Sequence, residues 1–500
     1  MLSKSSFLTG SRCSKLLWKK LNEPEAFPKI DPTSLSNFEQ GHRIGKLAKQ
    51  LYPGGIEVTE RMGQRATMVG ATKDLLEKRV PLFEAAFAYD GGYAQVDILV
   101  PDGEEAWRII EVKSGTDVKD EHVLDVAFQL HVCRGAGLKI TGCAILHVDS
   151  DYVREGEVDP AQLFREEDVT TQAADLVPEI SDKIWELEHI VAAPFAPLVS
   201  LGPYCNNPHP CELKGQCWKY LPKYPVTDLA NDTGGKRWRL LDEGITALTD
   251  IPDPESYSPK HQIQIKTART GEAHLSPAVL NSFLRDLEYP LAYFDIETAS
   301  AAIPLYDGTS PYQQIPFQFS LHVQNTPGGP LSHHEFLAKG KDDPRPAFLA
   351  ALKKALPEKG SIIAYNAVFE KRVLKEADIA CGDGTLSCEG LCEEGWVDPL
   401  AIRFLDLLIP FRSFAFHHRD QHGSASIKSV LPVLSNTSYK DLAIQDGNAA
   451  AQAFVATEFG EMPAAEREQT RHDLLEYCKL DTMAMVEVLE ALRSKEPAGA

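Results

Sequence analysis

The stretch Tyr93–Lys113, YAQVDILVPDGEEAWRIIEVK, consists of two apolar segments separated by a polar one. Residues alternate along the first segment, Tyr93–Val100, and the apolar second segment, Trp107–Lys113, is interpreted as the next strand. Asp97 projects from one face of the first strand, while Glu111 and Lys113 share a face of the second because they are two residues apart. If the strands pair antiparallel, Asp97 and Glu111 come close enough to share a divalent ion.

The residue types in this predicted hairpin suit phosphodiester hydrolysis. Carboxylate oxygens are hard ligands that favour Mg²⁺ or Mn²⁺. Such an ion lowers the pKa of a bound water and neutralises phosphate charge, and Lys113 is placed to orient the water or stabilise the developing charge. A hairpin with solvated acids is the alternative, because Glu-x-Lys alone is a weak signal.

The sequence around the hairpin predicts one α/β domain over residues 1–222. The expected helices are Asn37–Leu51, Ala71–Lys78, His122–Arg134 and Ala173–Val191, and the expected strands are Phe83–Tyr89, Tyr93–Val100, Trp107–Lys113 and Cys143–Val148. Helices, a strand meander, a helix and a strand in this order indicate an α/β fold.

Four of the ten cysteines bracket this domain, one near the N-terminus and three at its far end: Cys13, Cys205, Cys211 and Cys217. In a reducing cytosol, clustered cysteines indicate metal ligation rather than disulfides. Four thiolates are the complement of one iron–sulfur cluster, with a zinc site or buried free thiols as the alternatives. A later group, Cys381, Cys388 and Cys392, offers only three ligands and is interpreted as reduced loop thiols.

A second acid set opens another α/β domain, expected over residues 290–495. An apolar strand leads into Asp295-Ile296-Glu297, and alternation places both acids on one face. Two such carboxylates can bracket two metal ions in an in-line displacement. The other expected elements are strands at Pro316–Val323, His334–Leu337 and Ser361–Tyr365, and helices at Pro346–Leu356, Phe369–Ala377 and Ala464–Leu492.

Two later segments carry the remaining polar candidates of this domain. Asn366 follows a predicted strand, and Glu370 lies at the start of the next helix. Tyr477 and Asp481 are four residues apart on the C-terminal helix and therefore share a face. We expect this face to point into the same cleft as Asp295.

Residues 223–289 are interpreted as a connector, because prolines are frequent and long periodic runs are few. Within it, Leu240–Pro252, LLDEGITALTDIP, predicts two short helical pieces around a glycine turn. This segment resembles a helix-hairpin-helix fragment.

Composition restricts the partners and the location of the chain. Its 500 residues are 43% hydrophobic and 25% charged, and no apolar run reaches the ~20 residues that span a bilayer, so no membrane contact is expected. The net charge of −21 argues against a simple high-affinity nucleic-acid binder, so Lys and Arg should concentrate in a groove or a protein partner should assist. The basic N-terminal segment could be a transit peptide, but Cys13 inside it favours a mature, cytoplasmic segment.

On these residues, the N-terminal domain resembles the RecB-type branch of the PD-(D/E)xK nuclease superfamily. Asp97 and Glu111 match its metal ligands, Lys113 its catalytic lysine, and Gln129 the glutamine on its following helix. Iron–sulfur members carry one early and three late cysteines, which implies a [4Fe–4S] cluster on the four cysteines given above.

One position departs from the pattern of this branch. Its members often carry a metal-binding histidine where this chain has Gly45. His42 lies three residues away on a similar helical face and is the expected substitute.

The C-terminal domain resembles the DEDD, or DnaQ-like, exonucleases with the ribonuclease-H-like fold. Asp295 and Glu297 match the first motif of that family, and Asn366 through Glu370 match the second. Tyr477 and Asp481 match the third in its tyrosine variant. The resemblance implies four acids on two divalent ions, a tyrosine that positions water, and cleavage from a 3′ end. Most members have Asp where Glu370 stands.

The pairing of both domains resembles a bacterial family that fuses the two nuclease types. It predicts a cytoplasmic, Mg²⁺- or Mn²⁺-dependent nuclease acting on DNA. One alternative is a 3′–5′ RNA-processing exonuclease that uses only the C-terminal site. The other is a nucleic-acid- or partner-binding scaffold with two decayed sites, which Gly45 and Glu370 favour.

Overall fold

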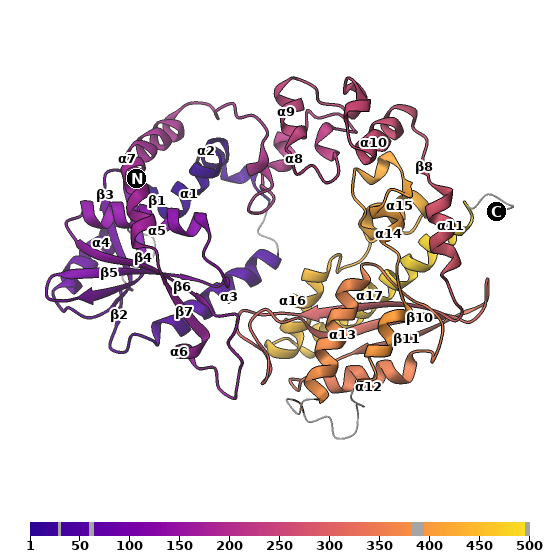
Figure 1. The fold of residues 1–500 in the computed structure, drawn as a ribbon. Helices are drawn as coiled ribbons and strands as arrows, with labels where there is room; N and C mark the ends of the chain where they lie inside the picture. The colour runs from indigo at the N-terminus through magenta and orange to yellow at the C-terminus, as the bar shows by residue number, and fades with distance from the viewer. Residues whose placement is uncertain (29–31, 60–64, 383–385, 387–394, 496–500) are drawn as a thin grey trace. The chain divides into compact units, whose positions relative to one another are not determined.

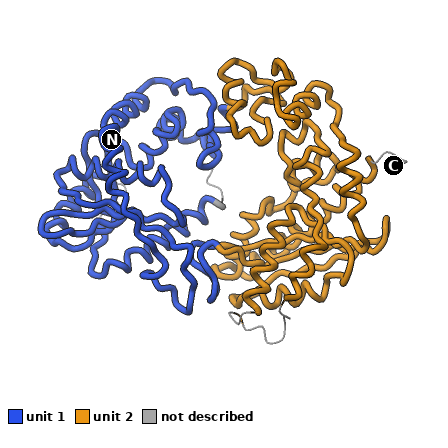
Figure 2. Tube along the Cα trace, viewed as in Figure 1, with its two compact units in different colours: residues 1–217, 301–312 blue, residues 218–300, 313–500 orange. Residues whose placement is uncertain are grey.

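The computed structural model describes residues 1–28, 32–59, 65–382, 386 and 395–495. The chain forms two compact units (Figure 2): unit 1 comprises residues 1–217 and 301–312, and unit 2 comprises residues 218–300 and 313–500. Both units combine helices with a mixed sheet, which confirms the predicted α/β class. Among the described residues, every helix is too short or too polar to cross a bilayer.

The sheet of unit 1 is built on the predicted strand meander. Strands β3, β4 and β5 pair antiparallel in sequence order, and β6 joins β5 in parallel. A parallel neighbour requires a crossover, which helix α5 (Asp120–Gly135) provides. Short strands complete the sheet in the order β2-β3-β4-β5-β6-β7, with β1 on β4. The strands are β1 Leu2–Ser3, β2 Ile56–Glu57, β3 Leu82–Tyr89, β4 Gly92–Asp102, β5 Ala106–Lys113, β6 Lys139–Val148 and β7 Phe164–Asp168.

Helices α1, α2, α5 and α7 pack together on one face of this sheet (Figure 1). Strand alternation decides which residues they cover: Leu99 and Ile109 belong to this core, whereas their neighbours Ile98 and Ile110 belong to the core on the other face. Leu99 and Ile109 therefore point towards these helices, as do Ala94 and Val96 nearer the start of β4. The remaining helical bounds of unit 1 are α1 Lys4–Arg12, α2 Ser14–Asn22, α3 Pro32–Lys49, α4 Arg65–Leu76, α6 Pro160–Leu163, α7 Thr170–Ala192 and α8 Lys214–Cys217.

Residues 301–312 join unit 1 from far along the sequence. Ala302 is buried in the core that contains Ile98 and Ile110. The Tyr312 hydroxyl donates a hydrogen bond to the carbonyl of Ser114 at 2.7 Å, directly after the end of β5. Unit 1 is thus discontinuous in sequence.

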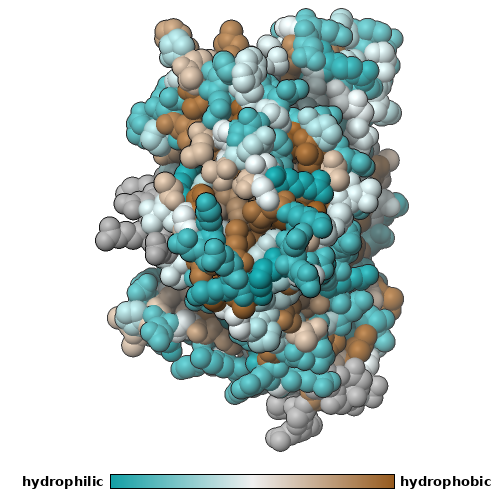
Figure 3. Space-filling model, turned by 90° about the vertical axis from the view of Figure 1, so that its left-hand side faces the viewer, coloured by the Kyte–Doolittle hydropathy of each residue, from teal (hydrophilic) through white to brown (hydrophobic). Residues whose placement is uncertain are grey.

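The face of unit 1 that Figure 3 shows is largely hydrophilic. Figure 3 shows the face on the left-hand side of Figure 1, where smaller apolar patches lie among hydrophilic residues.

Unit 2 contains a five-stranded sheet in the order β11-β10-β9-β12-β13. Strands β9, β10 and β11 pair antiparallel, whereas β12 and β13 continue the sheet in parallel with β9. Helices α12 and α13 cover one face through a core that includes Phe294, Ile296 and Phe348. The bounds are β9 Leu291–Ala299, β10 Ile315–Gln324, β11 Leu331–Leu337, β12 Ile362–Ala364, β13 Phe404–Asp406, α12 Arg345–Ala355 and α13 Ala367–Gly382.

Helices α16 and α17 pack against the opposite face of this sheet. The rings of Phe317 on β10 and Phe454 on α16 stack with centroids 4.1 Å apart. Gln318 donates a hydrogen bond to the carbonyl of Leu474 on α17 at 2.8 Å. The elements that follow β13 in the sequence are α14 Ile409–Arg412, β14 Phe416–His417, α15 Ile427–Leu434, α16 Gly447–Phe459 and α17 Ala464–Arg493.

The predicted connector is a folded part of unit 2 with a small core of its own, which includes Leu240, Leu248 and Ile265. The two helical pieces expected around Gly244 are present, and Gly244 has a left-handed backbone with φ 80°. Two further helices were not predicted, and each begins with a proline. Proline suits the first helical position, so the residues that suggested a connector instead start helices. The elements are α9 Lys236–Asp242, α10 Pro259–Thr270, β8 His274–Leu275 and α11 Pro277–Arg285.

Candidate functional site

The structure brings Asp97 and Glu111 together at the centre of the sheet of unit 1. The pairing of β4 with β5 runs as far as Ile98 opposite Ile110, and Asp97 and Glu111 are the next residues of the two strands. Both carboxylates face the helices over this side of the sheet. The backbone N–H of Val112 donates to Asp97 Oδ2 at 2.9 Å and fixes that side chain.

Helix α5 completes this first site with Gln129 and with Asp125, which the sequence analysis did not include. Gln129 Nε2 donates to Glu111 Oε2 at 2.8 Å and to Asp125 Oδ1 at 3.0 Å. Lys113 Nζ lies 2.7 Å from Glu111 Oε1 and 2.8 Å from Asp125 Oδ2. The four predicted residues of this site therefore converge, and a third carboxylate joins them.

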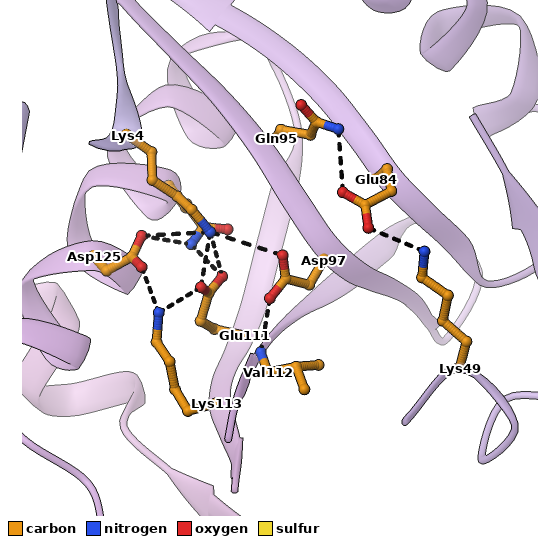
Figure 4. Close-up of polar contacts among 10 residues, drawn as sticks. Lys4, Lys49, Glu84, Gln95, Asp97, Glu111, Val112, Lys113 and Asp125 are labelled. Atoms are coloured by element: carbon orange, nitrogen blue, oxygen red, sulfur yellow. Dashed lines mark hydrogen bonds and ion pairs between the residues drawn. The ribbon is translucent and has the colours of Figure 1, made fainter. Parts of the chain in front are cut away.

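A second lysine enters the same site from the N-terminus. Lys4 Nζ lies 2.7 Å and 2.9 Å from the two carboxylate oxygens of Glu111, and 3.8 Å from an oxygen of both Asp97 and Asp125 (Figure 4). The sequence analysis also missed this residue. It is the first residue of α1, whose Phe7 ring lies 4.7 Å from that of Phe128 on α5.

The pKa values of the first site reflect burial opposed by ammonium charge. Burial and the Glu111 charge raise the pKa of Asp97 to about 7, although Lys4 counteracts them. Burial alone would raise the pKa of Glu111, but Lys4 and Lys113 outweigh it and hold that pKa well below its ordinary value. Burial and Glu111 raise the pKa of Asp125. The site therefore holds more carboxylate than its two ammonium groups neutralise.

The expected histidine substitute is not part of this site. His42 lies on α3 with an exposed side chain. Gly45 on the same helix has open space around it, because a Cβ placed there would meet no described atom beyond its chain neighbours and its own helix within 4 Å. Helix α3 therefore brings no side chain from position 42 or position 45 to the acids.

The four cysteines of the N-terminal half gather at one place. Burial raises the pKa of Cys13, and neighbouring Cys205 and Cys217 raise it further. Burial likewise raises the pKa of Cys211, with Cys13 and Cys205 adding to it. All four thiols are free. The early cysteine and the late triplet therefore form one four-thiol group.

Helix contacts fasten the N-terminus to this cysteine loop. Cys13 directly follows α1, and Arg12 Nε donates to the carbonyl of Tyr204 at 2.9 Å. Lys20 on α2 lies 2.8 Å from Glu212. The helix that carries Lys4 is thereby held at its C-terminal end by the segment that carries the late cysteines. Of the later cysteine group, Cys388 and Cys392 lie outside the described residues.

The second acid set is buried between the sheet of unit 2 and α17. Asp295 and Glu297 alternate with Phe294 and Ile296, which pack towards α12 and α13, so the carboxylates face α17. One ligand atom each of Asp295, Glu297 and Cys478 lies within 4.8 Å of the other two. Cys478 donates its thiol hydrogen bond to Asp295 Oδ2 at 3.6 Å.

Glu370 lies in the first turn of α13, near enough to Asp295 and Glu297 for its charge to raise the pKa of both. The preceding turn is strained, because Asn366 adopts a left-handed backbone with φ 82°. Asp406 holds the turn by accepting hydrogen bonds from the N–H groups of Asn366 at 2.9 Å and Leu408 at 3.0 Å. Glu370 Oε2 is buried and has no hydrogen-bond partner in the described part of the chain. A carboxylate oxygen left in this state is suited to a cation.

Tyr477 and Asp481 complete the set from α17, and both are buried. The hydroxyl of Tyr439, a residue not predicted, donates to Asp481 Oδ1 at 2.6 Å. Lys428 at the start of α15 lies 3.5 Å from the Tyr477 hydroxyl and 5.4 Å from the ring centroids of both tyrosines. The site thus contains four acids, two tyrosines, one thiol and one nearby lysine.

Mutual repulsion and burial dominate the electrostatics of the second site. Burial, followed by the charges of Asp481, Glu297 and Glu370, raises the pKa of Asp295 well above its ordinary value. Burial raises the pKa of Glu370 to about 8, and it raises that of Asp481 to about 6 against the Tyr439 hydrogen bond. Like-charged carboxylates in one buried site cannot all ionise without a compensating cation. One or two divalent ions fit this donor set, with the acids as hard oxygen ligands.

Comparison with known proteins covers part of the chain. Residues 292–426 match the family "Domain of unknown function (DUF2779)". This region contains Asp295, Glu297 and Glu370 and ends before Tyr477 and Asp481. The "Uncharacterized protein MG366 homolog" of Mycoplasma pneumoniae (strain ATCC 29342 / M129 / Subtype 1) is 27% identical over 226 residues. The match covers 41% of this chain and 32% of that protein, so the chain spans about a third of this relative. No solved structure matches the chain.

Proposed function

We propose that this protein is a divalent-metal-dependent nuclease that hydrolyses phosphodiester bonds in DNA, with 3′–5′ exonuclease activity in unit 2. The observation that carries the proposal is the convergence of Asp295, Glu297, Glu370 and Asp481 into one buried acid set. Its raised pKa values and the unpartnered oxygen of Glu370 favour Mg²⁺ or Mn²⁺. When bound, these ions supply a nucleophilic hydroxide and stabilise charge on the phosphate.

The other side chains of this site support the same reaction. Tyr477 lies beside the acids, where its hydroxyl can hold a water molecule in position. Lys428 opposes the raised pKa of Glu297 and Asp481 and brings a positive charge to a site that must accept a phosphate anion.

For unit 1 we propose a RecB-like second nuclease centre on Asp97, Glu111 and Asp125, with Lys113 and Gln129 positioning Glu111. The gathering of one early and three late cysteines supports a [4Fe–4S] cluster on Cys13, Cys205, Cys211 and Cys217. Zinc is the alternative, because four thiolates also form a structural zinc site.

The decisive experiment compares acid variants of the full-length protein on labelled single-stranded DNA and RNA with Mn²⁺. With a 5′ label, we expect wild type to produce a ladder that shortens from the 3′ end of DNA. Asp295→Asn should reduce that ladder at least about a hundredfold, because it removes a metal ligand. Asp441→Asn, an exposed acid of the same unit, should leave it unchanged and serves as the control.

The outcomes separate the candidate functions. A ladder that appears on RNA but not on DNA, and is lost in Asp295→Asn, identifies an RNA exonuclease. Cleavage within the DNA that is lost only in Asp97→Asn assigns an activity to unit 1. A wild type that cleaves neither polymer, or an Asp295→Asn variant as active as wild type, refutes the proposed catalytic role of unit 2.

A further inference from the structure

The ammonium group of Lys4 lies among three carboxylates that come from three separate elements. Asp97 is on β4, Glu111 on β5 and Asp125 on α5 (Figure 4). The distances from Lys4 Nζ are 2.7 Å to the nearest oxygen of Glu111 and 3.8 Å to each of the others. Three carboxylates around one positive centre form the arrangement that a hard divalent cation also requires.

Lys4 and Lys113 differ in how they meet these acids. Lys113 projects from β5 itself and contacts Glu111 and Asp125 from one side. Among the described residues, Lys4 is the cation with ion pairs to all three acids. Its side chain is 23% exposed and that of Asp97 is 27% exposed, whereas those of Glu111 and Asp125 are each 2% exposed. Lys4 is therefore the more accessible partner of the two acids that are almost fully buried.

The side chain of Lys4 can leave without unfolding the sheet. It is a flexible four-carbon chain at the first position of α1, and no strand residue of the acid set must move with it. The body of α1 is held by Phe7 in the core and by Arg12 at the cysteine loop. Withdrawal of Lys4 thus requires only a change of side-chain rotamer, while Leu2 and Ser3 stay paired with β4.

We propose that Lys4 is the resident cation of the first site and that a divalent ion binds there only by displacing it. This inference rests on the proposed metal site of unit 1. It assigns to Lys4 a regulatory role in metal binding: the ammonium group stabilises the metal-free site and weakens its affinity for Mn²⁺. The competitor is part of the chain, so the competition is independent of protein concentration.

Direct Mn²⁺ binding tests this competition without any measurement of nuclease activity. The protein carries Asp295→Asn and Asp481→Asn to remove the second site, and free Mn²⁺ is followed by electron paramagnetic resonance. Lys4→Met should bind Mn²⁺ about tenfold or more tightly than the background protein, because a positive charge within 4 Å of the ligands is removed. Lys4→Arg, which keeps the charge, should bind no more tightly than the background.

A control variant separates this effect from a general change in charge. Lys183 on α7 of the same unit pairs with Glu186 at 2.8 Å rather than with any of the three acids. Lys183→Met should leave Mn²⁺ affinity within about twofold of the background, since it removes the same charge at a different place. Adding Asp97→Asn should abolish the tight binding of Lys4→Met and so locate the ion.

A measurement on the wild-type chain tests the proposal even if the variants misfold. Reductive methylation followed by mass spectrometry reports the exposure of each lysine amine. Mn²⁺ should increase the labelling of Lys4 several-fold and leave that of Lys183 unchanged. The proposal is overturned if Mn²⁺ saturates the first site without changing Lys4 labelling, if Lys4→Met binds Mn²⁺ no better than the background, or if the first site takes up no Mn²⁺ in either protein.

Discussion

Tyr439 donates its hydroxyl hydrogen to Asp481 Oδ1 across 2.6 Å in the second site. The hydrogen bond stabilises the ionised carboxylate and opposes the burial that raises the pKa of Asp481 to about 6. A metal ligand must be ionised, so this contact extends the pH range over which the site can bind a cation.

We therefore expect Tyr439→Phe to move the acidic limb of the pH–rate profile upwards. Loss of the donor raises the pKa of Asp481, so activity should fall about tenfold at pH 6.5 and less at pH 8.5. Tyr365→Phe is the matched control, because Tyr365 donates to the carbonyl of Ala425 rather than to an acid. An equal loss at both pH values would show that Tyr439 acts through packing alone.

Glu370 should make the metal-free protein less stable as the pH rises. Its pKa is about 8 in the folded state against an ordinary value of 4.5, so the folded state binds the extra proton between these values. Stability contributed by that proton is present below about pH 4.5 and is lost as the pH rises through 8. Glu370→Gln should remove this loss, about 2–4 kcal/mol, so its stabilising effect relative to wild type should be larger at pH 8 than at pH 5.

Thermal melts in EDTA at both pH values measure this difference. Glu376→Gln, on the same helix but paired with Arg372 at the surface, controls for charge removal from α13. Saturating Mn²⁺ should abolish the pH dependence in wild type, since bound metal replaces the proton. A Glu370→Gln variant whose effect is the same at pH 5 and pH 8 would contradict the prediction.

Gln129 should matter for stability as well as for the first site. It is buried, and its amide donates to Glu111 at 2.8 Å and to Asp125 at 3.0 Å. Gln129→Met keeps most of the volume but removes both bonds, which should cost about 1–3 kcal/mol in urea denaturation. Gln129→Glu adds a fourth carboxylate and should destabilise the metal-free protein more, with partial recovery on addition of Mn²⁺. Recovery of Gln129→Met by Mn²⁺ to the same extent would argue against the electrostatic explanation.

The cysteine group should hold iron. Anaerobically purified wild type is expected to be brown, and Cys13→Ser should lose the visible absorbance and the bound iron, because one of four ligands is removed. Cys143→Ala changes a buried thiol in the core of the same unit and should keep both. Colourless wild-type protein with one equivalent of zinc would show that the group is a zinc site.

The alternation of residues along the strands was enough to predict which acids share a face: Asp97 with Glu111, and Asp295 with Glu297. Alternation along Tyr93–Lys113 already places Asp97 and Glu111 on matching faces, and an antiparallel register then brings them together. The sequence could have indicated Asp125 as a site residue, because it precedes Gln129 by four residues and so shares its helical face. An isolated acid in a helix is common, however, and only the contact with Glu111 distinguishes this one.

Other parts of the sites depend on long-range packing that no local pattern reveals. Lys4 belongs to a basic N-terminal segment whose helices were not predicted, and its partners lie about a hundred residues away. Tyr439 lies between α15 and α16, outside any helix or strand, so periodicity says nothing about its direction. The prolines at the starts of α10 and α11 suggested a connector, although proline at a first helical position is compatible with a folded segment.

The return of residues 301–312 to unit 1 has a consequence for how such a chain can evolve. Ala302 fills the hydrophobic interior of one half from within the sequence of the other. Recombination at a single point near residue 217 would remove Ala302 from the core of unit 1. It would also leave residues 301–312 in unit 2 without the core against which they pack. The two units therefore cannot be exchanged independently of each other, and we expect homologous chains to contain both.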